Sequence, residues 1–171
     1  MTGCLQVYTG DGKGKTTAAT GLAIRAVGAG MRVFIGQFIK SSDSAEMALI
    51  RKRLPEIVIE QFGAGGFITK KPSDNDIAHA HNGIQRLLEA LTGGNYDVVI
   101  ADEANGALDA GIISLDEIMQ LLDRRPENVE LVITGRNAAP ELLDKADLVT
   151  EMKNIKHCYD SGISARKGIE Y

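Results

Sequence analysis

A glycine-rich segment that joins an apolar run to a helical pattern constrains the fold of this chain more than any other feature. Residues 5–9 form a short apolar run, Gly10-Asp11-Gly12-Lys13-Gly14-Lys15-Thr16-Thr17 follows directly, and residues 14–27 read as a helix of small residues. Glycines let successive backbone N–H groups turn toward one anion, while the helix start adds partial positive charge and a lysine adds a full one. The expected ligand is a polyphosphate. A glycine-rich turn without a ligand is the competing interpretation, which the complete order of strand, loop, Gly-Lys-Thr-Thr and helix disfavours.

The segment is one residue shorter than the general phosphate-loop pattern, in which a glycine stands five positions before the Gly-Lys-Ser/Thr group. That pattern needs a glycine where Thr9 stands, so Gly10 is the first glycine of this loop. A shorter loop is expected to hold the phosphates in a different register. Thr16, directly after the lysine, would offer its hydroxyl to Mg²⁺.

Short apolar runs rich in branched residues alternate with longer stretches of helical period, a pattern typical of a parallel sheet with helices on both faces. The predicted fold class is α/β, a three-layer sandwich like that of phosphate-loop NTPases, with a mostly parallel sheet of about six strands in a single domain over 1–171. The predicted strands are 5–9, 33–38, 57–62, 97–101, 129–134 and 148–152. Helices are predicted over 14–27, over 74–91 and from Ser114 to about 125, the last with a capping box of Ser114 and Glu117.

The charge balance argues against a nucleic-acid or membrane partner. The chain carries 19 Lys+Arg against 23 Asp+Glu, a formal net charge of -4, without a block of basic residues, so unspecific attraction to nucleic acid or anionic lipid has little support. No apolar run approaches the roughly 20 residues of a membrane-spanning helix. Cys4 and Cys158 form neither a metal spacing nor a disulfide framework. We therefore expect a cytoplasmic protein.

Two carboxylates, Asp102 and Glu103, end the fourth apolar run. The carboxyl ends of parallel strands meet at the edge that carries the phosphate loop, where such residues hold Mg²⁺ directly or through water. The sequence predicts a magnesium site made by Thr16 with Asp102 or Glu103; in the alternative interpretation the two carboxylates only cap the next loop. Gln37 and Lys40 end the second strand at the same edge, which makes them possible substrate-site residues.

Several segments besides the loop resemble the phosphate-loop type of ATP:corrinoid adenosyltransferase, and the resemblance covers nearly the whole chain. The matching segments are Gly10 to Thr17, Gln37-Phe38-Ile39-Lys40, Gly66-Phe67, Asp102-Glu103, Arg125-Pro126, Thr134-Gly135-Arg136, Ala146 to Met152, Lys156-His157 and Gly168-Ile169-Glu170-Tyr171. The loop alone is shared with many unrelated NTPases, whereas the Thr-Gly-Arg block and the terminal Gly-Ile-Glu-Tyr are much more specific.

The resemblance implies transfer of the 5′-deoxyadenosyl group of ATP to a corrinoid reduced to its cob(I) state, with inorganic triphosphate leaving, in adenosylcobalamin biosynthesis or salvage. It implies Mg²⁺ as cofactor, an electron-donating reductase such as a flavoprotein as partner, and a homodimer. ATP would lie reversed in the loop compared with a kinase. By the same resemblance Lys15, Thr16 and Phe67 are catalytic, and Thr16 and Glu103 would serve Mg²⁺. The ATP-binding residues that it implies are Gly10, Asp11, Gly12, Lys13, Gly14, Lys15, Thr16, Thr17 and Arg136.

The corrinoid side departs from the family at one position. Phe67 would face the corrinoid and help exclude its lower axial ligand, but Thr69 stands where the family commonly has a tryptophan, and the chain has no Trp. Only a few residues precede Leu5, where members often carry an extension that covers the site. We therefore expect the corrinoid face to be open or to be closed by a partner subunit.

Two other function classes fit part of these residues. A nucleoside kinase or an ATPase would need only the loop with Asp102 and Glu103, and would form ADP. A nucleotide-gated corrinoid-binding protein with little turnover would fit the replacement at Thr69. His79 and His81 lie two apart on a predicted helix and make a poor metal pair.

Overall fold

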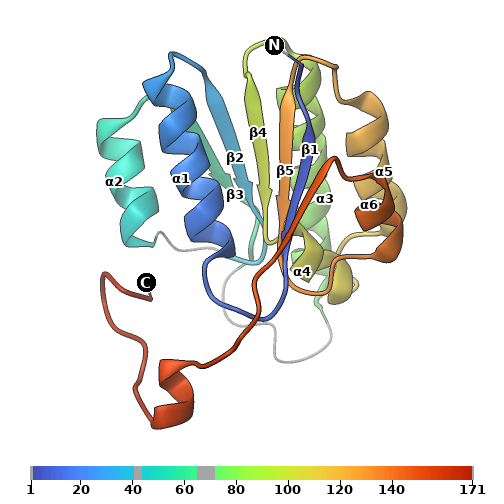
Figure 1. Cartoon of the computed structure of the whole chain (residues 1–171). Helices are drawn as coiled ribbons and strands as arrows, with labels where there is room; N and C mark the ends of the chain where they lie inside the picture. The colour runs from blue at the N-terminus through green and yellow to red at the C-terminus, as the bar shows by residue number, and fades with distance from the viewer. Residues whose placement is uncertain (1, 41–43, 65–71, 171) are drawn as a thin grey trace.

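The computed structural model describes residues 2–40, 44–64 and 72–170, and its centre is a six-stranded sheet (Figure 1). The strand order is β3-β2-β4-β5-β1-β6, and all of the neighbouring pairs run parallel. The strands are β1 (Leu5–Thr9), β2 (Val33–Gln37), β3 (Ile57–Gln61), β4 (Val98–Asp102), β5 (Glu130–Thr134) and β6 (Leu148–Glu151).

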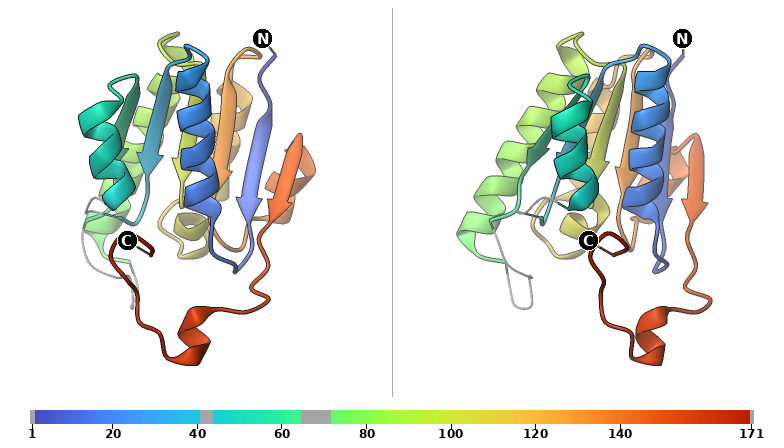
Figure 2. Two further views of the ribbon diagram at one scale, coloured as in Figure 1. Left: turned by 60° about the vertical axis from the view of Figure 1, so that its left-hand side comes forward. Right: turned by 90° about the vertical axis from the view of Figure 1, so that its left-hand side faces the viewer.

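Helices cover both faces of the sheet, which confirms the predicted three-layer α/β fold (Figures 1 and 2). Helices α1 and α2 pack on one face, and α3, α5 and α6 pack on the other. The helices are α1 (Lys15–Gly28), α2 (Ala45–Arg53), α3 (Asp74–Thr92), α4 (Ala104–Asp109), α5 (Leu115–Arg124), α6 (Pro140–Lys145) and the 3₁₀ helix η1 (Cys158–Ser161). None of the helices in the described ranges is long and apolar enough to cross a bilayer.

The central strands contribute to two hydrophobic cores, one on each face. All five residues of β2 and of β4 are buried, as expected for parallel strands covered on both sides. Successive side chains of β2 alternate between the cores: Phe34 packs in the core with Leu87 of α3, and Ile35 packs in the core with Ala23 of α1. The branched apolar runs of the sequence therefore form the rigid platform from which the loops of the site project.

Each predicted strand occurs within one residue of its expected bounds, and the three predicted helices correspond to α1, α3 and α5. The Ser114 hydroxyl accepts a hydrogen bond from the Glu117 backbone N–H, while the Glu117 carboxylate accepts from the Ser114 N–H. The predicted capping box is thus confirmed. No range was predicted for α2, α4 or α6. Helices α4 and α6 have six residues each, too few to show helical periodicity, and α2 buries only Met47 and Ile50.

Strand β6 lies at the edge of the sheet, pairs with β1, and has all four residues exposed. The chain that follows it leaves the sheet, passes beyond the carboxyl ends of the strands, and turns at η1 back toward the start of α1 (Figure 2). The sequence of this segment, 153–170, showed no periodic pattern. The structure places it beside the phosphate loop.

Candidate functional site

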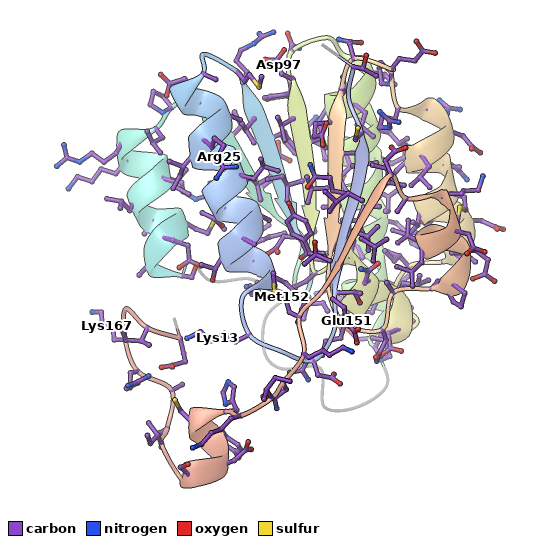
Figure 3. All side chains as sticks on the ribbon, viewed as in Figure 1. Lys13, Arg25, Asp97, Glu151, Met152 and Lys167 are labelled. Carbon is purple, nitrogen blue, oxygen red and sulfur yellow. The ribbon has the colours of Figure 1, made fainter. Side chains whose placement is uncertain are left out.

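The phosphate loop leaves the carboxyl end of β1 and is held against the chain that follows β6. The Gly12 N–H donates to the Met152 carbonyl at 2.6 Å, and the Met152 N–H donates to the Thr9 carbonyl at 2.8 Å. Gly10 and Gly14 have positive φ angles of 92° and 122°, which glycine adopts without steric cost. A Cβ added at Gly10 or Gly12 would lie 2.5 or 2.7 Å from the Met152 oxygen. Backbone packing therefore requires these glycines, with Met152 beside the loop in Figure 3.

Lys15, the first residue of α1, turns its side chain back over the loop. Its Nζ donates to the carbonyl oxygens of Gly10 at 2.6 Å and Gly12 at 2.9 Å, and Lys15 is only 7% exposed. Burial lowers the pKa of Lys15, against the opposing charge of Glu103. An ammonium group has three N–H donors, so Lys15 is placed to donate to a phosphate lying in the loop.

Lys13 points away from the loop toward the C-terminal segment (Figure 3). Its Nζ donates to the Ile169 carbonyl at 2.7 Å and lies 3.3 Å from the Glu170 carboxylate. Arg166 also binds that carboxylate, at 2.9 Å. These contacts, with Arg166 as the main cause, lower the pKa of Glu170 to about 2. One of the predicted triphosphate-binding lysines thus anchors the C-terminal segment.

Asp102, the last residue of β4, lies at the centre of a buried hydrogen-bond network and is 1% exposed. Its Oδ1 accepts from the Thr16 hydroxyl at 2.9 Å and from the Thr134 hydroxyl at 2.7 Å. Its Oδ2 accepts from Gln37 Nε2 at 2.9 Å, with Lys40 Nζ at 3.9 Å. Because Thr16 donates its hydrogen to Asp102, the lone pairs of its hydroxyl oxygen remain available to a cation.

Glu103 follows in the left-handed conformation, with a φ of 60°. Burial and then the neighbouring charge of Asp102 raise the pKa of Glu103, against the lowering effect of Lys40, Lys15 and Arg136. Glu103 lines an open hollow above the loop, whereas Asp102 lies beneath it. Of the two predicted metal-binding carboxylates, Glu103 is therefore the one that faces the space where a ligand would bind.

Gln37 and Lys40 both reach Asp102 from the end of β2, but only Lys40 lines the hollow. Gln37 is fully buried. Ile39 has a φ of 67°, and the Lys40 N–H donates to the Phe38 carbonyl at 2.7 Å, a tight turn that is rare for a branched residue. This turn brings the Lys40 ammonium to the two carboxylates at the end of β4.

Arg136 stands over the loop from the end of β5. The preceding Gly135 has a φ of 134°, and an added Cβ there would lie 2.6 Å from the Gly106 nitrogen. The Arg136 side chain is 64% exposed, with its Nε 3.9 Å from Asp11 Oδ1. An exposed ion pair of this kind contributes little stability, so Arg136 can exchange Asp11 for a phosphate at small cost.

One open hollow of about 1290 Å³ is lined by the side chains of Lys13, Lys15, Lys40, Glu103 and Arg136. That volume exceeds the roughly 300–1,000 Å³ of an ordinary small-molecule pocket, which leaves room for a nucleotide beside a second substrate. Sequence reasoning missed the wall formed by Tyr159 and Glu170 of the C-terminal segment. Contacts such as that of Lys13 with Ile169, 156 positions apart, leave no local pattern. The family-like segments Lys156-His157 and Gly-Ile-Glu-Tyr were the available signals, and His157 also lines the hollow.

The predicted corrinoid-facing residues, Phe67 and Thr69, lie outside the described residues. His79 and His81 are both exposed and have separate partners, the Asn75 carbonyl for His79 and the Glu117 carboxylate for His81. They do not form a site together.

Over the described ranges, no group of three or more His, Cys, Asp and Glu side chains is placed to hold a metal ion. Mg²⁺ does not need such a cage, because it commonly binds through one or two carboxylates together with substrate phosphates and water. The Thr16 hydroxyl with Asp102 and Glu103 supplies hard oxygen donors of this kind beside the loop. The residues present therefore fit Mg²⁺ in company with a bound polyphosphate.

Comparison with known proteins gives one consistent result. The chain matches a family model described as ATP:corrinoid adenosyltransferase BtuR/CobO/CobP over residues 1–171. It is 37% identical over 170 residues to a corrinoid adenosyltransferase of Pseudomonas aeruginosa, which covers 99% of this chain and 84% of that protein. A corrinoid adenosyltransferase of Escherichia coli K12 is also 37% identical, over 171 residues covering 99% of this chain and 86% of that protein.

Among solved structures, the flagellar accessory protein FlaH of Methanocaldococcus jannaschii superposes with a TM-score of 0.60 at 14% identity, covering 88% of this chain and 71% of that one. At this identity the likeness concerns the fold alone.

Proposed function

The chain belongs to the family of ATP:corrinoid adenosyltransferases, and on that premise we propose how its residues carry out the transfer. The enzyme transfers the adenosyl group of ATP to a corrinoid. In the reaction we propose, the cob(I) centre of a reduced corrinoid attacks the ribose 5′ carbon. The bond between that carbon and its oxygen breaks, and the bonding electron pair leaves with inorganic triphosphate.

The observation that carries this proposal is the gathering of Lys13, Lys15 and Arg136 around one loop in a chain of net charge -4. Negative charge develops on the departing triphosphate, so its stabilisation by fixed positive groups lowers the barrier. Lys15 and the loop N–H groups would bind the inner face of the triphosphate. Lys13 and Arg136, which are more exposed, would bind from the outside.

The reversed placement of ATP has support from the shape of the site. Thr9 stands where a longer loop would have its first glycine, so the loop encloses less of the phosphate chain than usual. The hollow also continues from the loop to Lys40 and to Tyr159 of the C-terminal segment. A nucleotide with its terminal phosphates in the loop would leave its 5′ carbon in this open part.

In the proposed site Thr16 and Glu103 hold Mg²⁺, and Asp102 orients Thr16. The buried position of Asp102 and its bonds to Thr16 and Thr134 support this division. When bound, Mg²⁺ neutralises charge on the phosphate oxygens. Lys40 would balance the carboxylate pair from the opposite side.

We propose the corrinoid side from the resemblance, with Phe67 excluding the lower axial ligand and a reductase such as a flavoprotein supplying the electron. We also propose that the enzyme is a cytoplasmic homodimer. Four large apolar side chains of the C-terminal segment, Ile155, Tyr159, Ile163 and Ile169, are exposed. Their number on one segment supports a second subunit beside the site, because extended apolar surfaces often mark protein interfaces.

An anaerobic assay with ATP, Mg²⁺ and chemically reduced cobalamin tests the proposal. We expect triphosphate release in step with the absorption change that accompanies formation of the adenosylcorrinoid. Formation of ADP under the same conditions would refute it and favour a phosphotransferase or an ATPase. Tight binding of ATP and corrinoid without turnover would favour a nucleotide-gated binding protein.

A further inference from the structure

A row of polar side chains crosses the sheet beneath the site. Gln61, Gln37 and Asp102 are the last residues of β3, β2 and β4 and are register partners across these strands. Side chains at matching positions of neighbouring strands point to one face. Gln61 Nε2 donates to Gln37 Oε1 at 3.0 Å, Gln37 Nε2 donates to Asp102 Oδ2 at 2.9 Å, and Thr134 completes this polar row at Asp102 Oδ1.

The direction of the hydrogen bonds along the polar row is determined by Asp102. Its carboxylate only accepts, so Gln37 presents its NH₂ group to Asp102 and its amide oxygen to β3. Gln37 is 0% exposed, which removes water as an alternative donor. The Gln61 NH₂ group supplies the required hydrogen bond. A carboxylate in place of Gln61 would place an acceptor opposite another acceptor, Gln37 Oε1. If the Gln37 amide turned over, its oxygen would instead face the acceptor Asp102 Oδ2.

We propose that Gln61 is a positioning residue for the binding of ATP with Mg²⁺. Acting through Gln37, it holds Asp102 in the orientation in which the carboxylate accepts the Thr16 hydroxyl hydrogen. The Thr16 oxygen is thereby presented to the cation beside the triphosphate. The inference rests on the proposed use of Thr16 with Mg²⁺ and ATP, and it extends the site to β3, which three strands separate from β1.

Three substitutions separate this hydrogen bond from a packing role. Gln61→Glu keeps the shape but cannot donate when ionised, Gln61→Met keeps most of the volume without a donor, and Gln61→Lys keeps a donor. The measured quantity is the Mg²⁺ concentration at half-maximal binding of a fluorescent ATP analogue to the purified full chain, without corrinoid. We expect this midpoint to rise about tenfold for Gln61→Glu, about threefold for Gln61→Met and less than about twofold for Gln61→Lys.

The matched control is Gln85→Glu, the same chemical change on an exposed position of α3, which should leave the midpoint unchanged. A double-substitution cycle tests the route: in a Gln37→Met background, Gln61→Met should have no further effect. A Gln61→Glu midpoint equal to that of the control, or below that of Gln61→Met, would overturn the inference. If Gln61→Glu does not fold, equal Mg²⁺ midpoints for Gln61→Met and Gln61→Lys would overturn the inference.

This readout is independent of the proposed reaction. If the wild type binds ATP with the predicted Mg²⁺ dependence but forms no adenosylcorrinoid, the proposed reaction fails while the role of Gln61 stands. If ATP binding by the wild type does not depend on Mg²⁺, the role of Gln61 is refuted directly.

Discussion

Alanine substitutions at four glycines should separate two physical demands on the phosphate loop, an unusual backbone angle and a close approach to Met152. Gly10 meets both demands, with a φ of 92° and the Met152 oxygen 2.5 Å from an added Cβ. Gly12 meets only the second, with that oxygen at 2.7 Å. Gly30 meets only the first, with a φ of 83° and no atom within 4 Å, and Gly28 of α1 meets neither.

The expected changes in the free energy of unfolding follow from these differences. A positive φ costs an alanine roughly 1–2 kcal/mol, and forcing a methyl group against packed backbone costs about 1–3 kcal/mol. Gly12→Ala also endangers the 2.6 Å hydrogen bond to Met152, which contributes about 1 kcal/mol. We expect losses of about 2–5 kcal/mol for Gly10→Ala, about 2–4 for Gly12→Ala and about 1–2 for Gly30→Ala. Gly28→Ala should be neutral or stabilising by up to about 1 kcal/mol.

Urea unfolding monitored by circular dichroism measures these energies, and calorimetric titration with ATP measures the consequence for the site. Gly10→Ala and Gly12→Ala should lose ATP affinity, because the residues around Met152 must move. Gly30→Ala and Gly28→Ala lie at the far end of α1 and should bind ATP like the wild type. If Gly12→Ala changed the free energy of unfolding and the ATP affinity no more than Gly28→Ala does, the close approach of the loop to Met152 would be refuted.

Three further substitutions test other parts of the site. Lys15→Ala should weaken ATP binding by about 100-fold in calorimetry, because it removes a charge-assisted contact; a retained cooperative unfolding transition is the control, and wild-type affinity would refute the assignment of the loop. Glu170→Gln should tighten ATP binding about threefold by releasing Lys13. Because the pKa of Glu170 falls from 4.5 to about 2 in the folded chain, the stabilising contact is present above pH 4.5 and is lost only as the pH falls toward about 2. The Arg166 backbone N–H donates to the Glu170 carboxylate at 2.7 Å. This N–H should therefore still be protected from hydrogen exchange at pH 4 in the wild type, and loss of protection at that pH would contradict the ion pair. Thr69→Trp should change the spectrum of bound corrinoid without changing ATP affinity, and a change confined to ATP affinity would contradict the predicted role of that position.

The strands and the loop could be predicted because their causes are local. Branched apolar runs such as Val98 to Ala101 mark strands covered on both faces, and the sequence from Gly10 to Thr17 contains the glycines and lysines that its geometry uses. The run from Leu148 to Glu151 shows the limit of this reasoning. It looks like a covered strand, yet all four residues are exposed, because strand order is set by long-range pairing that a local pattern does not record.

The local sequence pattern could not separate the roles of the two carboxylates for the same reason, and only the family resemblance favoured Glu103 for Mg²⁺. Asp102 and Glu103 are adjacent, and both looked like metal ligands. Their surroundings differ because Thr134 and Gln37, on the strands to either side of β4, bind both oxygens of Asp102, whereas Glu103 turns into the hollow. In the sequence, each of these strands ends in a polar residue, Gln37, Asp102 or Thr134. Only the strand order shows that these three residues are neighbours.

The two loop lysines also differ in a way that would couple the proposed ATP binding to the C-terminal segment. Lys15 donates to neutral carbonyl oxygens of its own loop, which a phosphate can replace at little electrostatic cost. Lys13 is paired with the Glu170 carboxylate, so a phosphate that takes Lys13 must compete with another anion. Linkage is reciprocal: if ATP weakens the contact between Lys13 and Glu170, that contact weakens ATP binding by the same factor. The segment that forms one wall of the hollow is therefore expected to respond to a nucleotide bound in the loop.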